Sequence, residues 1–392
     1  MNIKILIISI KKLTLFWLLL YSFLIFGQNE KESVGDKFEN LKDFFTVYPN
    51  KTKVEKDSTL YLSKLINAPI IGYAPETSMS LGIGAKYLFK FNGSGDETRT
   101  SNMPATLNYT FNNQFILYSG FEVFTNQEKW VIFGNALFQN FPRKYYGIGR
   151  DTPESNKALY DHYQVLFAPV VMKKVFARYL FLGGGVRFNH IFNVESEIED
   201  SVTGFNGSTS TGVQLSALYD SRDNILNASS GIYFAFSHGF YGEFLGGTQN
   251  FQLTRFDFRY FKSLSKNARN ILGFQFVGHF AKDNVPLAEL GYLGSGEIMR
   301  GYVKGRYIDK KFLASQVEFR KQFKNSRIGI VTFAGIGDVA EKFSEFKFNN
   351  LRPNFGAGFR FMIDTTENLN IRFDWGIGHN TDNVYLNLAE AF

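Results

Sequence analysis

The five histidines are the first residues to consider for catalysis or metal binding. None lies within four positions of another: His162, His190, His238, His279 and His379. The chain has no cysteine, so a zinc site built from the usual nitrogen and sulfur ligands has little support. Serine and aspartate are plentiful, but no motif selects a Ser/His or Asp/His set for hydrolysis. The sequence therefore predicts neither an enzyme nor a bound metal or cofactor.

An arginine in a long, apolar connection offers a different chemistry. The connection Val285–Lys310 shows no alternation of polar and apolar residues and contains five glycines. Loops of this length are usually functional or disordered, and the many aromatic and aliphatic side chains here argue against disorder. At Arg300, Gly301 and Tyr302 the loop places a permanent cation, a flexible residue and an aromatic ring in a row. We expect this loop to pack against the element that positions it.

A second polar cluster lies earlier in the chain, in residues 219–231. Its aspartate, asparagine, serine and glycine residues are typical of a turn, because they bond to nearby backbone or tolerate unusual backbone angles. The residues of interest in it are Asp220, Arg222, Asp223, Asn224 and Gly231.

The elements that must hold these residues are β-strands. In residues 369–377, apolar side chains stand at the odd positions and Asn370, Arg372 and Asp374 at even ones. The segments 254–260 and 313–320 alternate in the same way. Strict alternation indicates strands that present one apolar and one polar face.

Composition suggests what the apolar faces meet. Aromatic residues make up 17% of the chain, with 44 phenylalanines, yet mean hydropathy is only −0.15. A soluble β-sandwich also alternates, but two packed inner faces rarely need so many phenylalanines, whereas a lipid-facing belt does. In lipid every backbone group must pair internally, so such a sheet must close. The sequence predicts an all-β fold, a transmembrane antiparallel β-barrel.

The number of strands is less direct. Fifteen alternating segments can be read between residues 77 and 392. Bacterial single-chain barrels usually have an even number of strands. We therefore expect sixteen strands, with the missing one in the first third of the chain.

The N-terminus resembles an export signal. Lysines at positions 4, 11 and 12 precede an uncharged run of 14 residues, Leu13–Phe26. This run is shorter than the ~20 residues of a spanning helix and fits a signal peptide core. We predict a cleaved signal peptide at 1–27, a periplasmic lead segment at 28–69 and a barrel at 70–392. The alternative is a retained N-terminal anchor.

Charge gives little support for nucleic-acid binding. The formal net charge of +7 falls to +4 without the three signal lysines, because 40 basic and 36 acidic residues remain. The chain has neither a basic run nor a helix-turn-helix or RNA-binding motif. We expect no nucleic-acid partner, and we expect the partners to be outer-membrane lipid together with periplasmic or outer-membrane assembly proteins.

Three motifs together carry a family resemblance. Met299-Arg300-Gly301-Tyr302 resembles the V/I-R-G-F/Y loop-tip motif of the BamA/TamA (bacterial surface antigen) superfamily of outer-membrane barrels. The turn Asp220-Ser-Arg222-Asp223-Asn224…Gly231 resembles that family's D-x-R-D-N…P-x-x-G periplasmic turn. The closing segment Asn370–Phe392 is similar to the family's last strands.

The resemblance implies a sixteen-stranded barrel with the long loop folded into the lumen. In the family the loop arginine meets acidic residues on the two strands that follow, and the first match is Glu318. The register supports this match, since Glu318 shares the polar face of its segment with Gln316 and Arg320. A guanidinium suits the role because it stays charged and can bond a carboxylate through two hydrogen bonds.

Two features depart from the family pattern. Phe333-Ala-Gly335 has glycine where the second acid belongs, and Asp338 is expected on the opposite face. Arg300 is therefore expected to rely on Glu318 alone or on another lumenal acid such as Asp374. The POTRA modules of well-known members also have no counterpart, because only 42 residues lie between the signal and Pro69. Asp36–Val47 could form one short amphipathic helix, or the lead segment could be extended throughout.

Three functions remain open from the sequence. The first is BamA/TamA-like assembly or translocation of outer-membrane proteins or lipids, with a weak seam between the first and last strands. The second is a pore or uptake channel, and the third is a non-transporting scaffold of an outer-membrane complex. A first-to-last strand pairing much shorter than the other pairings would favour the first function.

Overall fold

The structure is a computed structural model that describes residues 63–95, 98–365 and 368–392. The predicted signal peptide at 1–27 and the lead segment up to residue 62 lie outside these residues. Among the residues that the structure describes, no helix is long and apolar enough to cross a membrane.

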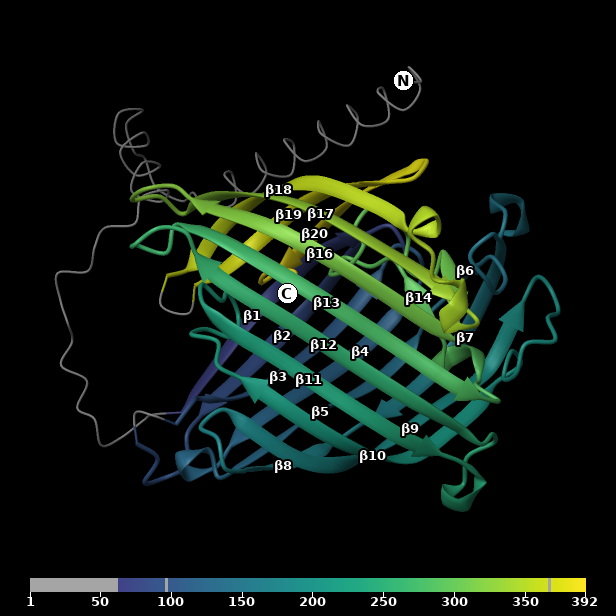
Figure 1. Cartoon of the computed structure of the whole chain (residues 1–392), viewed down its shortest axis with the longest axis horizontal. Coiled ribbons are helices and arrows are strands. Elements are labelled where there is room, and N and C mark those ends of the chain that lie inside the picture. Colours follow the sequence, from purple (N-terminus) through teal and green to yellow (C-terminus); the bar gives the residue numbers. More distant parts are fainter. Residues whose placement is uncertain (1–62, 96–97, 366–367) are drawn as a thin grey trace, which may run out of the picture. The chain divides into compact units, whose positions relative to one another are not determined.

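One antiparallel sheet forms the wall and closes on itself (Figure 1). Its strands are β1 (Lys64–Ala74), β2 (Ser78–Phe89), β3 (Ser101–Thr110), β4 (Phe115–Phe124), β5 (Trp130–Asn140), β7 (Ala158–Phe167), β8 (Val170–Lys174), β9 (Leu180–Ser196), β10 (Ser208–Asp220), β11 (Gly231–Tyr241), β12 (Phe251–Ser263), β13 (Asn270–Asp283), β16 (Lys311–Gln322), β17 (Ile328–Ala340), β18 (Arg352–Asp364), β19 (Leu369–Gly378) and β20 (Thr381–Leu388).

The wall has sixteen strand positions within the described residues, because β7 and β8 share one. Both pair with β5 on one side and β9 on the other. The break between them contains Pro169, which has no backbone N–H to donate. The closed, sixteen-stranded antiparallel barrel predicted from the sequence is confirmed.

The strand that the sequence reading missed is β1. It pairs with β2 over eleven residues, from Lys64 opposite Leu88 to Ala74 opposite Ser78. The wall therefore begins at Lys64, six residues before the predicted boundary at Ile70. The alternation of β1 is weak, because Asn67 and Pro69 interrupt it, and this explains why periodicity did not reveal it.

Alternation decides which side chains face the lumen. Along β19, Asn370, Arg372 and Asp374 are buried inside the barrel, while Trp375 on the other face is 41% exposed. Outward-facing residues of other strands are similarly apolar and exposed, such as Leu215 and Phe355. Apart from the junction of β1 with β20, the wall strands pair their backbones with neighbours on both sides, which is what a lipid surrounding requires.

Shorter elements lie between the wall strands. They are β6 (Arg143–Tyr145), β14 (Gly291–Leu293), β15 (Tyr307–Asp309), and the single-turn 3-10 helices η1 (Asn126–Glu128), η2 (Glu154–Asn156), η3 (Glu243–Leu245), η4 (Leu287–Glu289), η5 (Phe343–Glu345) and η6 (Phe348–Asn350). The hairpin β14–β15 and helix η4 belong to the long loop between β13 and β16.

The long loop packs in two apolar clusters. Leu287 and Leu290 join a cluster with Tyr160, Phe205 and Phe251 of the wall and its connections. Nearer the tip, a second cluster of buried side chains combines loop and wall residues: Leu293, Met299, Tyr302, Tyr307, Phe312, Ala314 and Val339. The loop tip thus lies against lumen-facing side chains of the wall.

Candidate functional site

The loop tip is a tight turn that brings its backbone against the wall. Met299 has a φ of 56° and Gly301 a φ of 111°, both in the left-handed region. A Cβ atom at Gly301 would lie 2.8 Å from the carbonyl carbon of Ile377 and 2.9 Å from that of Gly376 in β19. Glycine is therefore required at 301 both for its backbone angle and for the close approach to β19.

Arg300 is held by two carboxylates from different strands. Its Nη2 atom lies 2.5 Å from Oε2 of Glu318 in β16, and its Nη1 atom lies 2.7 Å from Oδ2 of Asp374 in β19. The guanidinium carbon lies 3.5 Å from the ring centroid of Phe333 in β17. Arg300, Glu318 and Asp374 are fully buried, and we call these three residues the loop lock.

The second acid of the loop lock comes from β19, two strands further than the family pattern implies. On β17, Gly335 occupies the position where the family has an acid, and a Cβ there would lie 2.6 Å from Oδ1 of Asn354. Asp338 does not reach Arg300; it forms an ion pair with Arg150 at 3.0 Å instead. Asp374 was the alternative lumenal acid proposed from the sequence, and the structure places its carboxylate beside Arg300.

Further arginines neutralise the two acids. Arg320 Nε lies 2.7 Å from Oε1 of Glu318, and Arg360 Nη1 lies 2.6 Å from Oδ1 of Asp374. Arg372 Nη1 lies 3.1 Å from Oδ2 of Asp374. Alternation had placed Arg320 and Arg372 on polar faces, but it could not show that they share partners with Arg300.

The loop tip also binds the last strand of the wall. The backbone N–H of Gly301 donates to the hydroxyl of Tyr385 at 3.0 Å. The carbonyl oxygen of Gly301 accepts from Thr381 Oγ1 at 3.0 Å and Asn383 Nδ2 at 2.6 Å. Tyr302 donates to the carbonyl of Pro353 at 2.9 Å. The tip therefore connects β18 and β20.

A second ionic anchor lies at the beginning of the loop. Here the loop contributes the carboxylate and the wall contributes the arginines. The carboxylate of Glu289, which is fully buried, lies 3.2 Å from Arg187 of β9 and 3.1 Å from Arg255 of β12. Asn189 donates to it at 2.6 Å. Burial alone would raise the pKa of Glu289, but the two arginines hold it below its ordinary value. This anchor could not be predicted from the sequence, since Glu289 belongs to no motif.

The predicted turn motif is bonded mainly to itself. Arg222 Nε lies 2.9 Å from Oδ1 of Asp220. The Oδ1 of Asp223 accepts from the backbone N–H of Ser229 at 2.9 Å, and Asn224 Oδ1 accepts from Leu226 N–H at 2.7 Å. Gly231 has a φ of 110°. These bonds fix the turn between β10 and β11.

Arg99, which was not predicted from the sequence, connects this turn to other segments at the same end of the barrel. Its Nη1 lies 2.9 Å from Oδ2 of Asp220, and its Nε lies 2.9 Å from Oε1 of Glu128. Arg99 belongs to the connection between β2 and β3, so the contact joins segments 121 residues apart. It depends on barrel closure, which no local pattern encodes.

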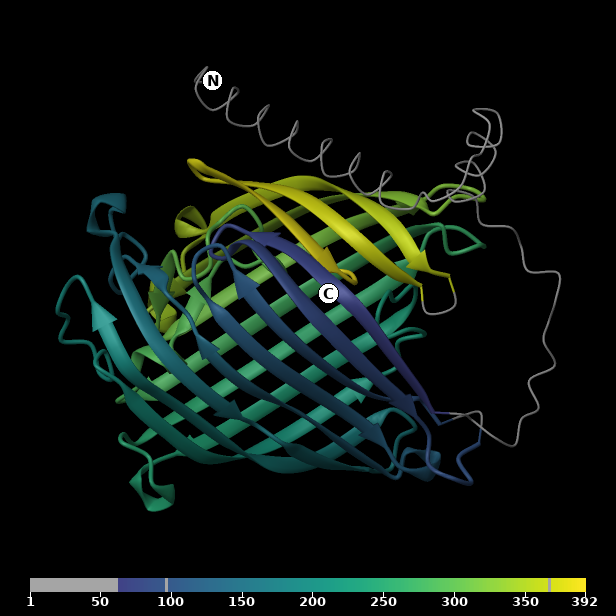
Figure 2. The same cartoon turned by 180° about the vertical axis from the view of Figure 1, so that it is seen from behind.

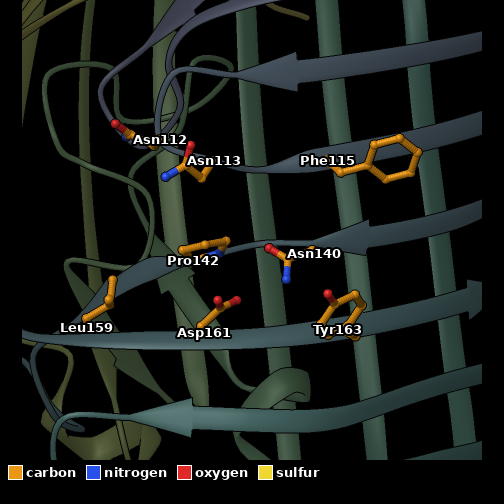
Figure 3. Close-up of a pocket in the computed structure, with 8 residues that line it drawn as sticks. All are labelled: Asn112, Asn113, Phe115, Asn140, Pro142, Leu159, Asp161 and Tyr163. Atoms are coloured by element: carbon orange, nitrogen blue, oxygen red, sulfur yellow. The ribbon is translucent and has the colours of Figure 1, made fainter.

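Two cavities show where other molecules could enter. A cavity of about 490 Å³ lies in the lumen beside the loop and is lined by polar residues that include Gln214, Arg259 and Glu297. A second hollow of about 580 Å³ is lined by β4, β5, β7 and the turn before β4, with Phe115, Asn140 and Tyr163 at its edge (Figure 3). None of its lining residues belongs to the loop lock. Among the described residues no group of His, Asp or Glu side chains could hold a metal ion.

The seam that closes the barrel is the shortest pairing of full-length wall strands in the described sheet. β1 and β20 share one residue pair, Tyr73 with Leu386, and lie side by side in Figure 2. β20 pairs with β19 over eight residues, and β1 pairs with β2 over eleven. Among the residues that the structure describes, the edge of β1 from Lys64 to Gly72 therefore has no strand partner on this side.

A family comparison decides where this barrel belongs. The Omp85 superfamily domain matches residues 79–392, which contain the loop lock, the turn motif and β20. The chain belongs to the Omp85 superfamily. Its Omp85 barrel identifies it as an outer-membrane protein, and the resemblance to BamA/TamA-type barrels is confirmed.

Solved structures show the same Omp85 barrel at low sequence identity. BamA from Haemophilus ducreyi lacking POTRA domains 1–3 is 12% identical with a TM-score of 0.56, and the match covers 94% of this chain and 81% of that chain. CdiB from Escherichia coli is 10% identical with a TM-score of 0.58, covering 84% and 63%. CdiB from Acinetobacter baumannii is 11% identical with a TM-score of 0.55, covering 84% and 60%. The chain thus spans less than two thirds of either CdiB, and no curated protein sequence matches it.

Proposed function

We propose that this chain assembles or translocates outer-membrane proteins or lipids, and that its clients engage the wall at the seam between β1 and β20. The observation that carries this proposal is the single residue pair of the seam. A strand edge with free N–H and C=O groups can accept an incoming strand by backbone hydrogen bonding. The role needs no catalytic chemistry, and the clients and accessory proteins would be its partners.

The loop lock supports a mechanism for controlling the seam. The tip bonds Tyr385, Thr381 and Asn383, all on β20, while Arg300 is anchored on β16 and β19. The loop can therefore hold β20 from inside the barrel, while the edge of β20 that faces β1 stays largely unpaired. Movement of the loop would free β20 to swing away from β1 or toward it.

A disulfide across the seam tests the proposal. The chain has no native cysteine, so a Tyr73→Cys/Leu386→Cys pair would form a single defined bridge. We expect the bridged protein to lose support for outer-membrane protein or lipid assembly in cells depleted of the unmodified chain, and a reductant to restore it. The matched control is Tyr73→Cys/Met79→Cys, which bridges β1 to β2 instead. Normal client levels with the seam bridged, or unchanged levels after depletion, would overturn the proposal.

The lumenal cavity favours one alternative, a solute pore. Its lining includes charged and polar residues such as Arg255, Asp257 and Gln275, which would suit water and small solutes. If the chain is a pore, planar bilayers should show steady conductance that grows when Arg300→Met releases the loop. If it is an assembly barrel, the unmodified chain should stay closed and the seam bridge should still abolish client assembly.

A further inference from the structure

The last four residues of the sequence do not continue the wall. Ala389 has a φ of 64°, and its N–H donates to the carbonyl of Asn370 at 2.8 Å. A non-glycine residue in the left-handed region is uncommon. The turn sends the chain inward, where Phe392 stacks on Phe261 of β12 at 5.8 Å between ring centroids. We call residues 389–392 the tail.

Glu390 of the tail joins the arginines of the loop lock. Its Oε2 lies 2.8 Å from Nε of Arg360 and 3.9 Å from Nε of Arg320, and its Oε1 accepts from Asn370 Nδ2 at 2.6 Å. Arg320 also donates to the backbone oxygen of Phe392 at 2.8 Å. The same two arginines therefore hold the tail and the acids that bind Arg300.

These contacts form a closed ring of alternating charge. The order around the ring is Arg300, Glu318, Arg320, Glu390, Arg360, Asp374 and back to Arg300. Arg372 joins it through Asp374. Among the described residues, four guanidinium groups and three carboxylates thus make up this group, which we call the lock cluster. Every member has a buried side chain, and that of Glu390 is 3% exposed.

An extended tail could instead lengthen the seam. In the register that pairs Tyr73 with Leu386, a straight chain would place residues 387–392 opposite residues 72–67 of β1. The tail cannot occupy both places, because extension withdraws Glu390 and Phe392 from the lumen. The docked tail thus completes the lock cluster and leaves the edge of β1 free.

We propose that Glu390 is a positioning residue that couples the tail to the loop lock. The docked tail then favours the loop-bound state with a short seam, and extension of the tail weakens the hold on Arg300. The meaning of this coupling for client entry rests on the proposed function, but the coupling itself does not. Because coupling between two sites is reciprocal, loss of Arg300 must also weaken the docking of the tail.

The charges of the lock cluster set the direction of the effect. Counting the side chains alone, the cluster carries a net charge of +1 with Arg300 in place, so removing Glu390 leaves +2 in a buried place. Without Arg300 the cluster is neutral with the tail docked, and removing Glu390 leaves only +1. The tail is therefore held more tightly when Arg300 is bound, since buried unbalanced charge is costly.

Two alternative disulfides that share one cysteine, introduced at position 391, measure the position of the tail. Ala391→Cys paired with Ala228→Cys reports the docked tail, since both alanines lie in one buried cluster. Ala391→Cys paired with Ala68→Cys reports the extended tail in the register above. The ratio of the two cross-linking yields, in barrels shown to be folded by heat-modifiable migration, gives the balance between the states.

Glu390→Gln should shift this ratio about tenfold toward the extended tail, and Glu390→Asp should partly restore docking. Arg300→Met should shift the ratio in the same direction, and the double variant should fall short of the product of the single effects. Glu195→Gln, on an exposed part of β9, is the matched control and should leave the ratio unchanged.

An unchanged ratio in Arg300→Met, or single effects that multiply fully, would overturn the coupling. Normal client assembly with the seam bridged would instead refute the proposed function while leaving a measured coupling intact. If Glu390→Gln fails to fold, Glu390→Asp in combination with Arg300→Met completes the same cycle with a smaller expected shift.

Discussion

Replacing Asp374 by asparagine should destabilise the barrel more than replacing Arg300 by methionine. Both residues are fully buried, and each loses a direct ionic contact with the other at 2.7 Å. The two changes differ in what they leave behind. Without Arg300, Glu318 still pairs with Arg320, and Asp374 with Arg360 and Arg372. Without the charge of Asp374, three arginines lose the carboxylate that they share.

The expected magnitudes follow from this charge balance. Arg300→Met takes the lock cluster from +1 to neutral, so its cost is mainly the lost charge-assisted hydrogen bonds, about 1.5–3 kcal/mol. Asp374→Asn keeps the shape of the side chain but takes the cluster from +1 to +2. Breaking a buried pair so that a charge is left unbalanced costs about 3–5 kcal/mol. The midpoints of these two ranges differ by about 2 kcal/mol, which is the expected difference between the variants.

Reversible unfolding in urea, with the barrel in detergent micelles or lipid vesicles, measures these free energies. Folding is followed by tryptophan fluorescence and checked by heat-modifiable migration. Equal losses in the two variants, or a larger loss in Arg300→Met, would refute the charge balance assigned to the lock cluster. A change in the slope with urea would show that the unfolded or folded state itself had changed.

Two further predictions concern the rest of the loop. Gly301→Ala should lower the thermal midpoint far more than Gly305→Ala. Both glycines have a positive φ, but only at residue 301 would an added Cβ lie within 2.9 Å of backbone atoms. Similar losses in the two variants would contradict the close approach of the loop to β19. Glu289→Gln should lower the unfolding free energy at neutral pH. Because the folded pKa of Glu289 lies below 4.5, this difference should fade as the pH drops below about 4.5, and a difference that grows in acid would contradict the assigned ion pairs.

The fold was readable from the sequence where alternation was strong. In residues 369–377 the period of two identified both the strand and the side that faces the lumen, and the structure confirms both. β1 escaped the same reading because Asn67 and Pro69 interrupt its apolar face. Its place in the wall comes from its eleven pairs with β2, which are tertiary contacts.

Only part of the loop site could be predicted from the sequence. The motif at Arg300 and the register of Glu318 indicated a guanidinium and a carboxylate facing the lumen. The second acid could not be chosen, because Asp374 lies 74 residues from Arg300 and competes in the sequence with nearer acids such as Asp338. Glu289 and Glu390 gave no signal, since a single glutamate in a connection or tail is ordinarily solvated.

The sequence by itself therefore determined the class of fold, the face of each alternating strand and the residue types available in the lumen. These properties follow from local periodicity and composition. Closure of the barrel decided which of those residues meet, and it brought the acids of β16 and β19 to Arg300 and Glu390 of the tail to Arg360. It also left β1 and β20 with a single pair, and the inward turn at Ala389 takes residues 389–392 away from the seam that they could have extended.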